Sequence, residues 1–167
     1  MILTIWRHGQ AGSAPTDRER ELTLLGREQL VSGARQYHRA CQAAGVPLPV
    51  LLMHSPWLRT TQTARIVSSE LENVPLNSCD HLAPGRQPGD VTDLLAELLE
   101  KPGHPGHVCL VSHQPLVSRL IDHLSGDTGR VPPLVPGGLA VLELDVPGPG
   151  CARNLLWAMP PLYEAQK

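Results

Sequence analysis

The sequence contains no phenylalanine, and aromatic residues make up only 3% of its 167 residues. Its core must therefore be built mainly from leucine, valine, isoleucine and alanine. No apolar run is long enough to cross a membrane, and the short apolar run at the N-terminus lacks the preceding lysine or arginine of a secretory signal. We therefore expect a cytoplasmic protein with no membrane partner.

An excess of charge of one sign is also absent, as are closely spaced cysteines. The net charge of −2 gives no general attraction toward nucleic acid, so no nucleic-acid partner is predicted. Cys41, Cys79, Cys109 and Cys151 form no C-x-x-C pair, which favours four small buried side chains over a zinc site or a redox motif. The 41% hydrophobic and 18% charged residues are typical of a globular chain, and the length predicts one domain over residues 1–167.

Short β-forming runs alternate with helical segments along most of the chain. The alternation predicts an α/β fold, a three-layer α/β/α sandwich whose central sheet is mainly parallel. Two late runs joined by a turn predict a hairpin, and hence an antiparallel strand at the edge of the sheet. Strands are expected at residues 2–6, 50–54, 76–79, 107–113, 139–146 and 154–158, and helices at 24–44, from 56 to about 71, at 91–100 and from 115 to about 124.

Three residues are predicted to cap these helices at their N-termini. Thr23 precedes the first helix, Ser55 precedes the second with Pro56 in its first turn, and Asp90 precedes the third. In this interpretation Arg59 lies in the first turn of the second helix, close to the end of the strand before it. The free N–H groups at that helix end add partial positive charge to the same place.

Basic and imidazole side chains follow three of the buried strands. Arg7 and His8 follow the first strand, Arg59 comes shortly after the second, and His113 ends the run at 107–113. Because the carboxyl ends of parallel strands meet at the edge where ligands bind, we expect these four groups to converge. Gly9 gives the chain a sharp exit and lets its backbone approach a ligand closely. On the tripeptide Arg-His-Gly alone, a surface turn would be an equally good interpretation.

Two guanidinium groups and two imidazoles at one place predict an anion site with a nucleophile. Guanidinium groups donate fork-shaped pairs of hydrogen bonds that match phosphate oxygens. The neighbouring arginine charges disfavour protonation of His8, and a nucleophilic nitrogen must be unprotonated. A bound phosphate dianion would instead favour the charged, donating form of His113.

Four sequence blocks in this order resemble the histidine phosphatase superfamily, which includes the cofactor-dependent phosphoglycerate mutases. Together they are specific, and they span residues 2 to about 120; the last third of the chain carries no recognisable motif. The short length and the run from Leu110 to Val117 are most similar to the SixA branch, small bacterial protein-phosphohistidine phosphatases. The blocks are Arg7-His8-Gly9, Leu22-Thr23-x-x-Gly26, Ser55-Pro56-x-x-Arg59-x-x-Gln62-Thr63-Ala64 and Ser112-His113.

The resemblance implies a mechanism and a partner. It implies that His8 is phosphorylated during turnover and that Arg7, Arg59 and His113 bind the phosphoryl group and stabilise its transition state. No metal or cofactor is implied. The implied substrate is a phosphorylated histidine-containing phosphotransfer protein, and the implied product is inorganic phosphate. Only residues 80–106 fill the gap where larger relatives insert helices, which suits a phosphohistidine displayed on a protein.

The sequence departs from the family where relatives carry acidic residues. Gln10 stands where many have an acid after Arg-His-Gly, and Asp80-His81 replaces the Glu that often donates a proton. His81 or Asp80 could donate that proton, and solvated loop residues are an equally good interpretation of both. A missing acid would matter little for phosphohistidine, whose imidazole leaves easily. The charged run at 17–21 is interpreted as a solvated loop, and His54 as a packing residue.

Two other functions remain open at this point. One is the same chemistry on a small phosphomonoester, or a mutase, although a mutase must retain its intermediate and the short lid disfavours it. The other is a catalytically weak module that only binds phosphorylated ligands in the same pocket.

Overall fold

In the computed structural model, which describes residues 1–167, six strands form one sheet in the order β3-β2-β4-β1-β5-β6. The four strands from β3 to β1 are parallel, whereas β5 runs antiparallel to β1 and β6 antiparallel to β5. The predicted parallel sheet with an antiparallel edge is confirmed. The strands are β1 (Ile2–Arg7), β2 (Leu51–His54), β3 (Leu76–Ser78), β4 (His107–Ser112), β5 (Leu139–Leu144) and β6 (Ala152–Ala158).

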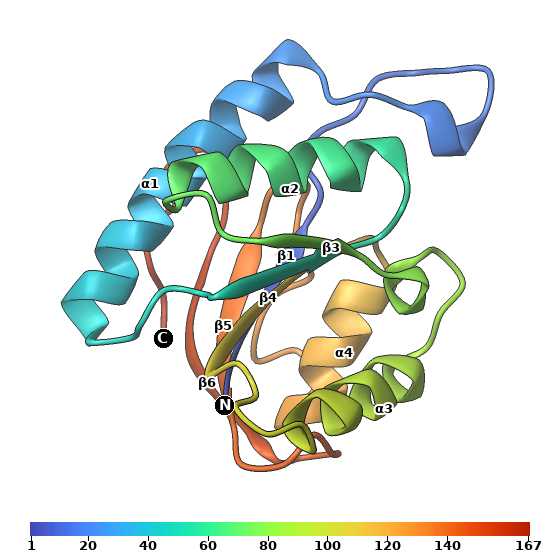
Figure 1. Ribbon diagram of the computed structural model, residues 1–167. Coiled ribbons are helices and arrows are strands. Elements are labelled where there is room, and N and C mark those ends of the chain that lie inside the picture. The colour runs from blue at the N-terminus through green and yellow to red at the C-terminus, as the bar shows by residue number, and fades with distance from the viewer.

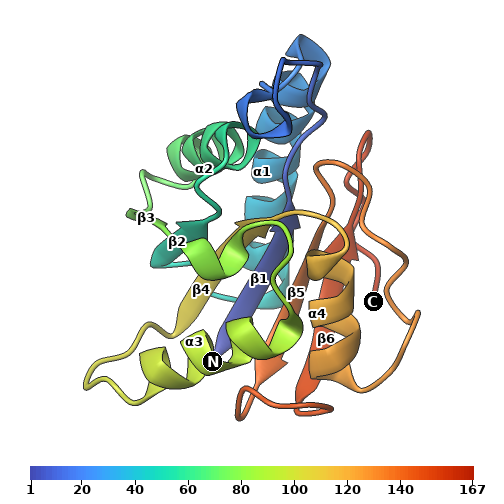
Figure 2. The ribbon, with the colours of Figure 1, turned by 90° about the vertical axis from the view of Figure 1, so that its right-hand side faces the viewer.

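Helices cover both faces of this sheet (Figures 1 and 2). Helices α1 (Leu24–Ala44) and α2 (Leu58–Glu70) lie on one face, and α3 (Pro88–Leu99) and α4 (Leu116–Ser125) lie on the other. Two short 3-10 helices, η1 (Asp17–Glu19) and η2 (Asp80–Leu82), lie in the connecting loops. No helix combines the length and the apolar character that a membrane crossing requires.

Successive residues of the central strands point to opposite faces of the sheet. In β4, Val108 and Leu110 pack with α3 and α4, whereas Cys109 and Val111 pack with α1 and α2. Both faces of β4 are therefore buried, which explains its continuous apolar sequence.

The core is almost entirely aliphatic, as the composition predicted. Trp6 and Tyr37 are the largest fully buried side chains, and their rings meet edge to face with centroids 5.5 Å apart. Three of the four cysteines are buried, but Cys151 is only half-buried because it lies in the turn before β6. All four are free thiols.

One predicted helix cap is confirmed and two are wrong. The hydroxyl of Thr23 accepts a hydrogen bond from the N–H of Gly26 at 3.0 Å, which caps α1. Ser55 does not cap α2, which begins only at Leu58 after the N-cap Trp57; its hydroxyl lies beside His113 and accepts a hydrogen bond from the N–H of Trp57 at 3.4 Å. Asp90 lies inside α3, where its carboxylate accepts a hydrogen bond from the backbone N–H of Gln87, the actual N-cap.

The pairing of β1 with β4 brings the two histidine-bearing turns together. Arg7 lies opposite Ser112 in the sheet, and the N–H of His8 donates to the carbonyl of Ser112 at 3.0 Å. His8 and His113 therefore leave the sheet side by side at its C-terminal edge. Strand β2 ends beside β4 at the same edge, so α2 starts there too.

Candidate functional site

A cavity of about 420 Å³ opens at the C-terminal edge of the sheet. It is lined by all four residues that were predicted to converge: Arg7, His8, Arg59 and His113. Its volume is that of an ordinary small-ligand site. The full lining is Arg7, His8, Gln10, Ala11, Asp17, Arg20, Arg59, Pro84, His113, Gln114 and Pro136.

The imidazole of His8 is buried and held in one tautomer. Its Nδ1 lies 2.8 Å from the carbonyl oxygen of Gly9, and a carbonyl can only accept, so Nδ1 carries the proton. Its Nε2 accepts a hydrogen bond from Nε of Arg59 at 3.1 Å and is therefore unprotonated. Burial, reinforced by the charges of Arg59 and Arg7 and opposed by the bond to Gly9, lowers the pKa of His8 to about 4. A neutral ring thus has an Nε2 lone pair that can act as a nucleophile at neutral pH once the hydrogen bond from Arg59 is released.

Arg7 is anchored from behind, and its Nε and Nη2 make no hydrogen bond within the chain. Its Nη1 donates to the carbonyl of Leu134 at 2.8 Å, and its backbone N–H donates to the carbonyl of Gly138. Its Nε is buried and has no hydrogen-bond partner. A buried donor without a partner is costly to stability.

Arg59, the second residue of α2, is held by both side chain and backbone of Asp17. Its side chain is 5% exposed, its Nη1 donates to the backbone carbonyl of Asp17 at 2.6 Å, and its Nη2 donates to the Asp17 carboxylate at 3.2 Å. The other carboxylate oxygen accepts from Arg20 at 2.9 Å. The charged run at 17–21 is solvent-exposed, as predicted, but it is not only a solvated loop, because Asp17 and Arg20 also line the cavity.

His113 contributes a second buried nitrogen that lacks a partner. Its ring centroid lies 5.1 Å from that of His8, and its Nε2 lies 2.8 Å from the hydroxyl oxygen of Ser55. Its Nδ1 is buried and has no hydrogen-bond partner. Burial and the nearby charges of His8 and Arg59 lower the pKa of His113 to about 3. A dianion in the cavity would reverse the electrostatic part of that shift.

The other motif residues support this geometry without touching the cavity. The hydroxyl of Thr63 accepts from the N–H of Gly9 at 3.1 Å, and the side-chain carbonyl of Gln62 accepts from the N–H of Leu22 at 2.8 Å. Gly26 is needed because a Cβ there would lie 2.4 Å from the carbonyl oxygen of Gln10. These contacts hold helices α1 and α2 against the Arg-His-Gly turn and the loop that follows it.

Gly9 has a different role from the one predicted. Its φ is not positive, and a Cβ there would lie 2.7 Å from the Leu30 side chain. The glycine therefore allows the turn to pack closely on α1, and close approach of its backbone to a ligand is not what requires it.

The segment at 126–138 completes the site through its backbone. The N–H of Gly137 donates to the carbonyl of His8, and the carbonyl of Gly137 accepts from the indole N–H of Trp6. The carbonyl of Leu134 also accepts from the Gln114 amide at 2.9 Å. Sequence reasoning missed this role, since backbone carbonyls leave no signal in the residue types. Asp17 and Arg20 did carry a signal, opposite charges three residues apart just after the Arg-His-Gly turn.

The two candidate proton donors of the sequence analysis do not line the cavity. Asp80 and His81 are both exposed, and Nδ1 of His81 lies 3.7 Å from the sulfur of Cys79. Of the loop that follows β3, only Pro84 reaches the cavity. His54 is buried outside the cavity, with Nδ1 at 2.8 Å from the Ser55 carbonyl, as its predicted packing role requires.

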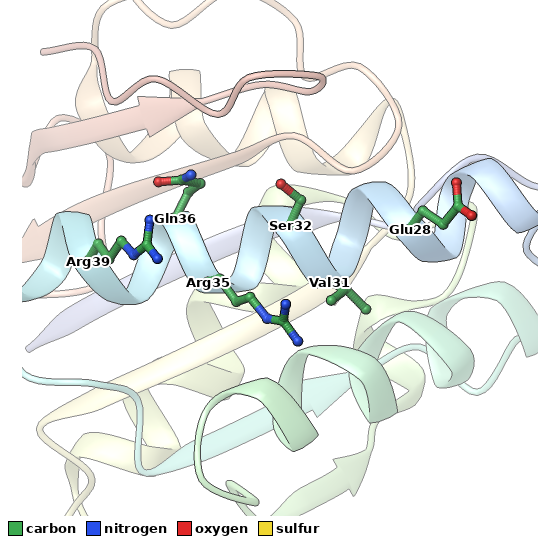
Figure 3. A pocket seen from close by; sticks show the side chains of 6 residues that line it. All are labelled: Glu28, Val31, Ser32, Arg35, Gln36 and Arg39. Atoms are coloured by element: carbon green, nitrogen blue, oxygen red, sulfur yellow. The ribbon is translucent and has the colours of Figure 1, made fainter.

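A second hollow, of about 380 Å³, lies on the outer face of α1 and contrasts with this cavity (Figure 3). Its arginines are on the solvent side of the helix, and Arg35 is paired with Glu70 of α2 at 2.8 Å. It is lined by Glu28, Val31, Ser32, Arg35, Gln36 and Arg39 and contains no histidine or cysteine. No group of three or more histidine, cysteine or acidic side chains anywhere in the chain has a metal-binding arrangement.

Comparison with known proteins agrees with the predicted resemblance. No protein-family model and no curated protein sequence matches the chain. Among solved structures, the protein histidine phosphatase SixA complexed with tungstate superposes with a TM-score of 0.79 at 29% identity, covering 96% of this chain and 97% of that one. A candidate phosphohistidine phosphatase SixA from Agrobacterium tumefaciens gives 0.79 at 21% identity, over 95% and 98% of the two chains.

A small-molecule enzyme has the same fold. The mycobacterial glucosyl-3-phosphoglycerate phosphatase superposes with a TM-score of 0.64 at 19% identity, over 92% of this chain and 96% of that one. The structural neighbours of this chain are thus SixA phosphohistidine phosphatases and related members of the histidine phosphatase superfamily, which confirms the resemblance.

Proposed function

We propose that this chain, whose neighbours are SixA-type and related phosphatases, is a phosphatase that removes phosphate from phosphohistidine in a protein. The observation that carries the proposal is one cavity lined by Arg7, Arg59 and His113 together with His8, whose Nε2 is unprotonated. Guanidinium groups donate fork-shaped pairs of hydrogen bonds that match the oxygens of a phosphoryl group, and a protonated imidazole adds a further donor.

In the proposed first step, Nε2 of His8 forms a bond to phosphorus while the bond from phosphorus to the substrate imidazole breaks. Negative charge on the three equatorial oxygens is offset by Arg7, Arg59 and a protonated His113. In the second step the oxygen of a water molecule replaces His8 on phosphorus. Inorganic phosphate leaves, and His8 regains its lone pair.

The chemistry of the cavity supports a nitrogen leaving group. Asp17 is the only carboxyl group that lines it, and Arg20 and Arg59 hold the pKa of Asp17 below its usual range. No carboxylic acid in the cavity is therefore protonated at neutral pH. An imidazole departs with little help because its second nitrogen can already carry a proton, whereas an alkoxide needs a proton almost fully delivered.

A small phosphomonoester is the second candidate substrate, favoured by the shared fold of the mycobacterial glucosyl-3-phosphoglycerate phosphatase. The roles of Asp80 and His81 as proton donors are not proposed again, since neither side chain lines the cavity. The cytoplasmic location expected from the sequence stays a prediction.

The test is to compare kcat/KM for a phosphorylated histidine phosphotransfer protein, an aryl phosphate and an alkyl phosphate. We expect the phosphoprotein to be the best substrate, the aryl phosphate to be measurable and the alkyl phosphate to be poor. Efficient hydrolysis of an alkyl phosphate would favour the small-molecule alternative. Binding of phosphoprotein without turnover of any substrate would favour the binding module.

A further inference from the structure

The carboxylate of Asp17 is the one negatively charged group in a cavity that otherwise contains three arginines. Its two oxygens accept from two of those arginines, from Nη2 of Arg59 at 3.2 Å and from Nη1 of Arg20 at 2.9 Å. Because these guanidinium groups hold the pKa of Asp17 low, the side chain is a carboxylate at neutral pH. The proposed phosphoryl chemistry gives this carboxylate no role.

Every nitrogen of the Arg59 guanidinium is already engaged. Nε donates to Nε2 of His8 at 3.1 Å, Nη1 donates to the backbone carbonyl of Asp17, and Nη2 donates to the Asp17 carboxylate. These bonds use three of the five N–H groups, so a phosphoryl oxygen near His8 that accepts from the second N–H of Nη2 shares that nitrogen with the Asp17 carboxylate. Carboxylate and phosphoryl oxygens are the same kind of partner for a guanidinium fork.

The two members of this ion pair differ in their freedom to move. The Arg59 side chain is 5% exposed and is fixed on α2, whereas the Asp17 side chain is 54% exposed and belongs to the three-residue helix η1. No residue of η1 is buried, so Asp17 can shift without opening the core. The geometry is that of a fixed cation with a displaceable internal anion.

We propose that Asp17 is a specificity-determining residue, an internal anion that competes with phosphoryl oxygens for Arg59 and Arg20. The competition weakens the binding of small free anions, including the product inorganic phosphate. A phosphorylated protein offsets it with contacts outside the cavity, which a small phosphate cannot make. The inference rests on the proposed function only in that the cavity must bind phosphoryl groups.

The test compares tungstate and inorganic phosphate binding to the native protein and to the Asp17→Asn variant at pH 7.5, by titration calorimetry. Asparagine keeps an oxygen that accepts from Arg59 but removes the charge. We expect Asp17→Asn to bind both anions at least about tenfold more tightly, a change of about 1.4 kcal/mol. Asp17→Ser, which shortens the side chain, should change affinity in the same direction.

Glu19→Gln is the matched control, because it removes one negative charge from the same helix η1 at an exposed position outside the cavity. It should change anion affinity less than twofold. If Asp17 only anchored the loop, its loss would loosen Arg59 and anion affinity would fall. An unchanged or weaker affinity in Asp17→Asn, or loss of the fold in that variant, would therefore overturn the inference.

A kinetic measurement separates this inference from the proposed function. Asp17→Asn should lower KM for an aryl phosphate more than it lowers KM for the phosphoprotein. The ratio of kcat/KM for the phosphoprotein to kcat/KM for the aryl phosphate should therefore decrease. If the native protein binds neither anion and hydrolyses neither substrate, the proposed function fails. If it does both and Asp17→Asn changes neither affinity nor preference, only the role of Asp17 fails.

Discussion

Strand β4 has a buried histidine at each end, and the two differ in what surrounds them. His107 begins the strand, and both of its nitrogens are satisfied, Nδ1 by the carbonyl of Pro47 at 2.6 Å and Nε2 by the hydroxyl of Thr4 at 2.8 Å. His113 follows the strand, and its Nδ1 has no partner. Burial lowers the pKa of His107 to about 4, and burial with nearby charges lowers that of His113 to about 3.

A lowered pKa therefore does not distinguish the two ends of the sheet, whereas partners and charges do. The polar groups around His107 are uncharged: they are the hydroxyls of Thr4 and Tyr37 and a backbone carbonyl. Together they provide partners for both ring nitrogens. Around His113 lie the charges of Arg59 and Arg7, and one ring nitrogen remains free. The first arrangement is typical of a structural residue, and the second is the one expected in the proposed phosphate site.

The largest expected effect is the loss of activity when the proposed nucleophile, His8, is replaced. His8→Ala should reduce kcat by at least about 10⁴-fold, because no other ring in the cavity presents a lone pair to the same point. Rapid quench with labelled substrate should detect an acid-labile phosphoenzyme in the native protein and none in the variant. A phosphoenzyme that persists in His8→Ala would assign the nucleophile to another residue.

A smaller effect is expected from Arg59, and an arginine elsewhere provides the control. Arg59→Ala should lower kcat/KM about 10²-fold, because it removes a buried donor to the developing charge. This corresponds to a loss of roughly 3 kcal/mol of transition-state stabilisation. Arg35→Ala removes an exposed arginine from α1, and with it the pair with Glu70, and should change kcat/KM less than twofold. A loss below tenfold in Arg59→Ala would mean that this side chain does not contact the phosphoryl group.

The sequence was sufficient to predict where these groups meet. Arg7-His8 and His113 each follow a run of β-formers, and parallel strands necessarily end at the same edge. It was not sufficient for the proton donors. β3 lies three strand positions from β1 in the order β3-β2-β4-β1, roughly 14 Å away, so a residue just after β3 starts far from His8.

The contributions of loops were also beyond the sequence. Asp17 reaches Arg59 only because the loop before α1 folds back over the cavity, and the Leu134 carbonyl reaches Arg7 only because the segment at 126–138 follows one particular path. Hydrophobic periodicity carries no information about either path. Ser55 shows the same limit, since a hydroxyl beside Pro56 is typical of a helix cap until the fold brings His113 within reach.

At the start of β4, replacing His107 should lower stability without lowering catalytic activity. His107→Ala leaves the carbonyl of Pro47 and the hydroxyl of Thr4 without their shared partner, which should reduce the free energy of unfolding by about 3 kcal/mol. Urea unfolding measures this change. The kcat/KM per folded molecule should stay within about threefold of native, and a large loss of activity at unchanged stability would contradict the assignment.

The last effect concerns the dependence of stability on pH. The pKa of His107 is near 6.5 when unfolded and about 4 when folded, so between these values the unfolded chain binds a proton that the native ring refuses. Its contribution to stability is therefore complete above pH 6.5 and is lost as the pH falls toward 4, by up to about 1.4 kcal/mol per pH unit. His8 and His113 act in the same sense while the cavity is empty.

Urea unfolding between pH 4.5 and 7.5 can separate the two ends of the strand. His107→Ala should lower the slope of unfolding free energy against pH by up to about 1.4 kcal/mol per pH unit, which corresponds to one proton. This change should be the same with and without sulfate, an anion that stays doubly charged over this range. Sulfate in the cavity should raise the pKa of His8 and His113 and flatten their share of the slope, compared with chloride at equal ionic strength. A slope that sulfate leaves unchanged in the native protein would mean that no anion binds beside His8 and His113.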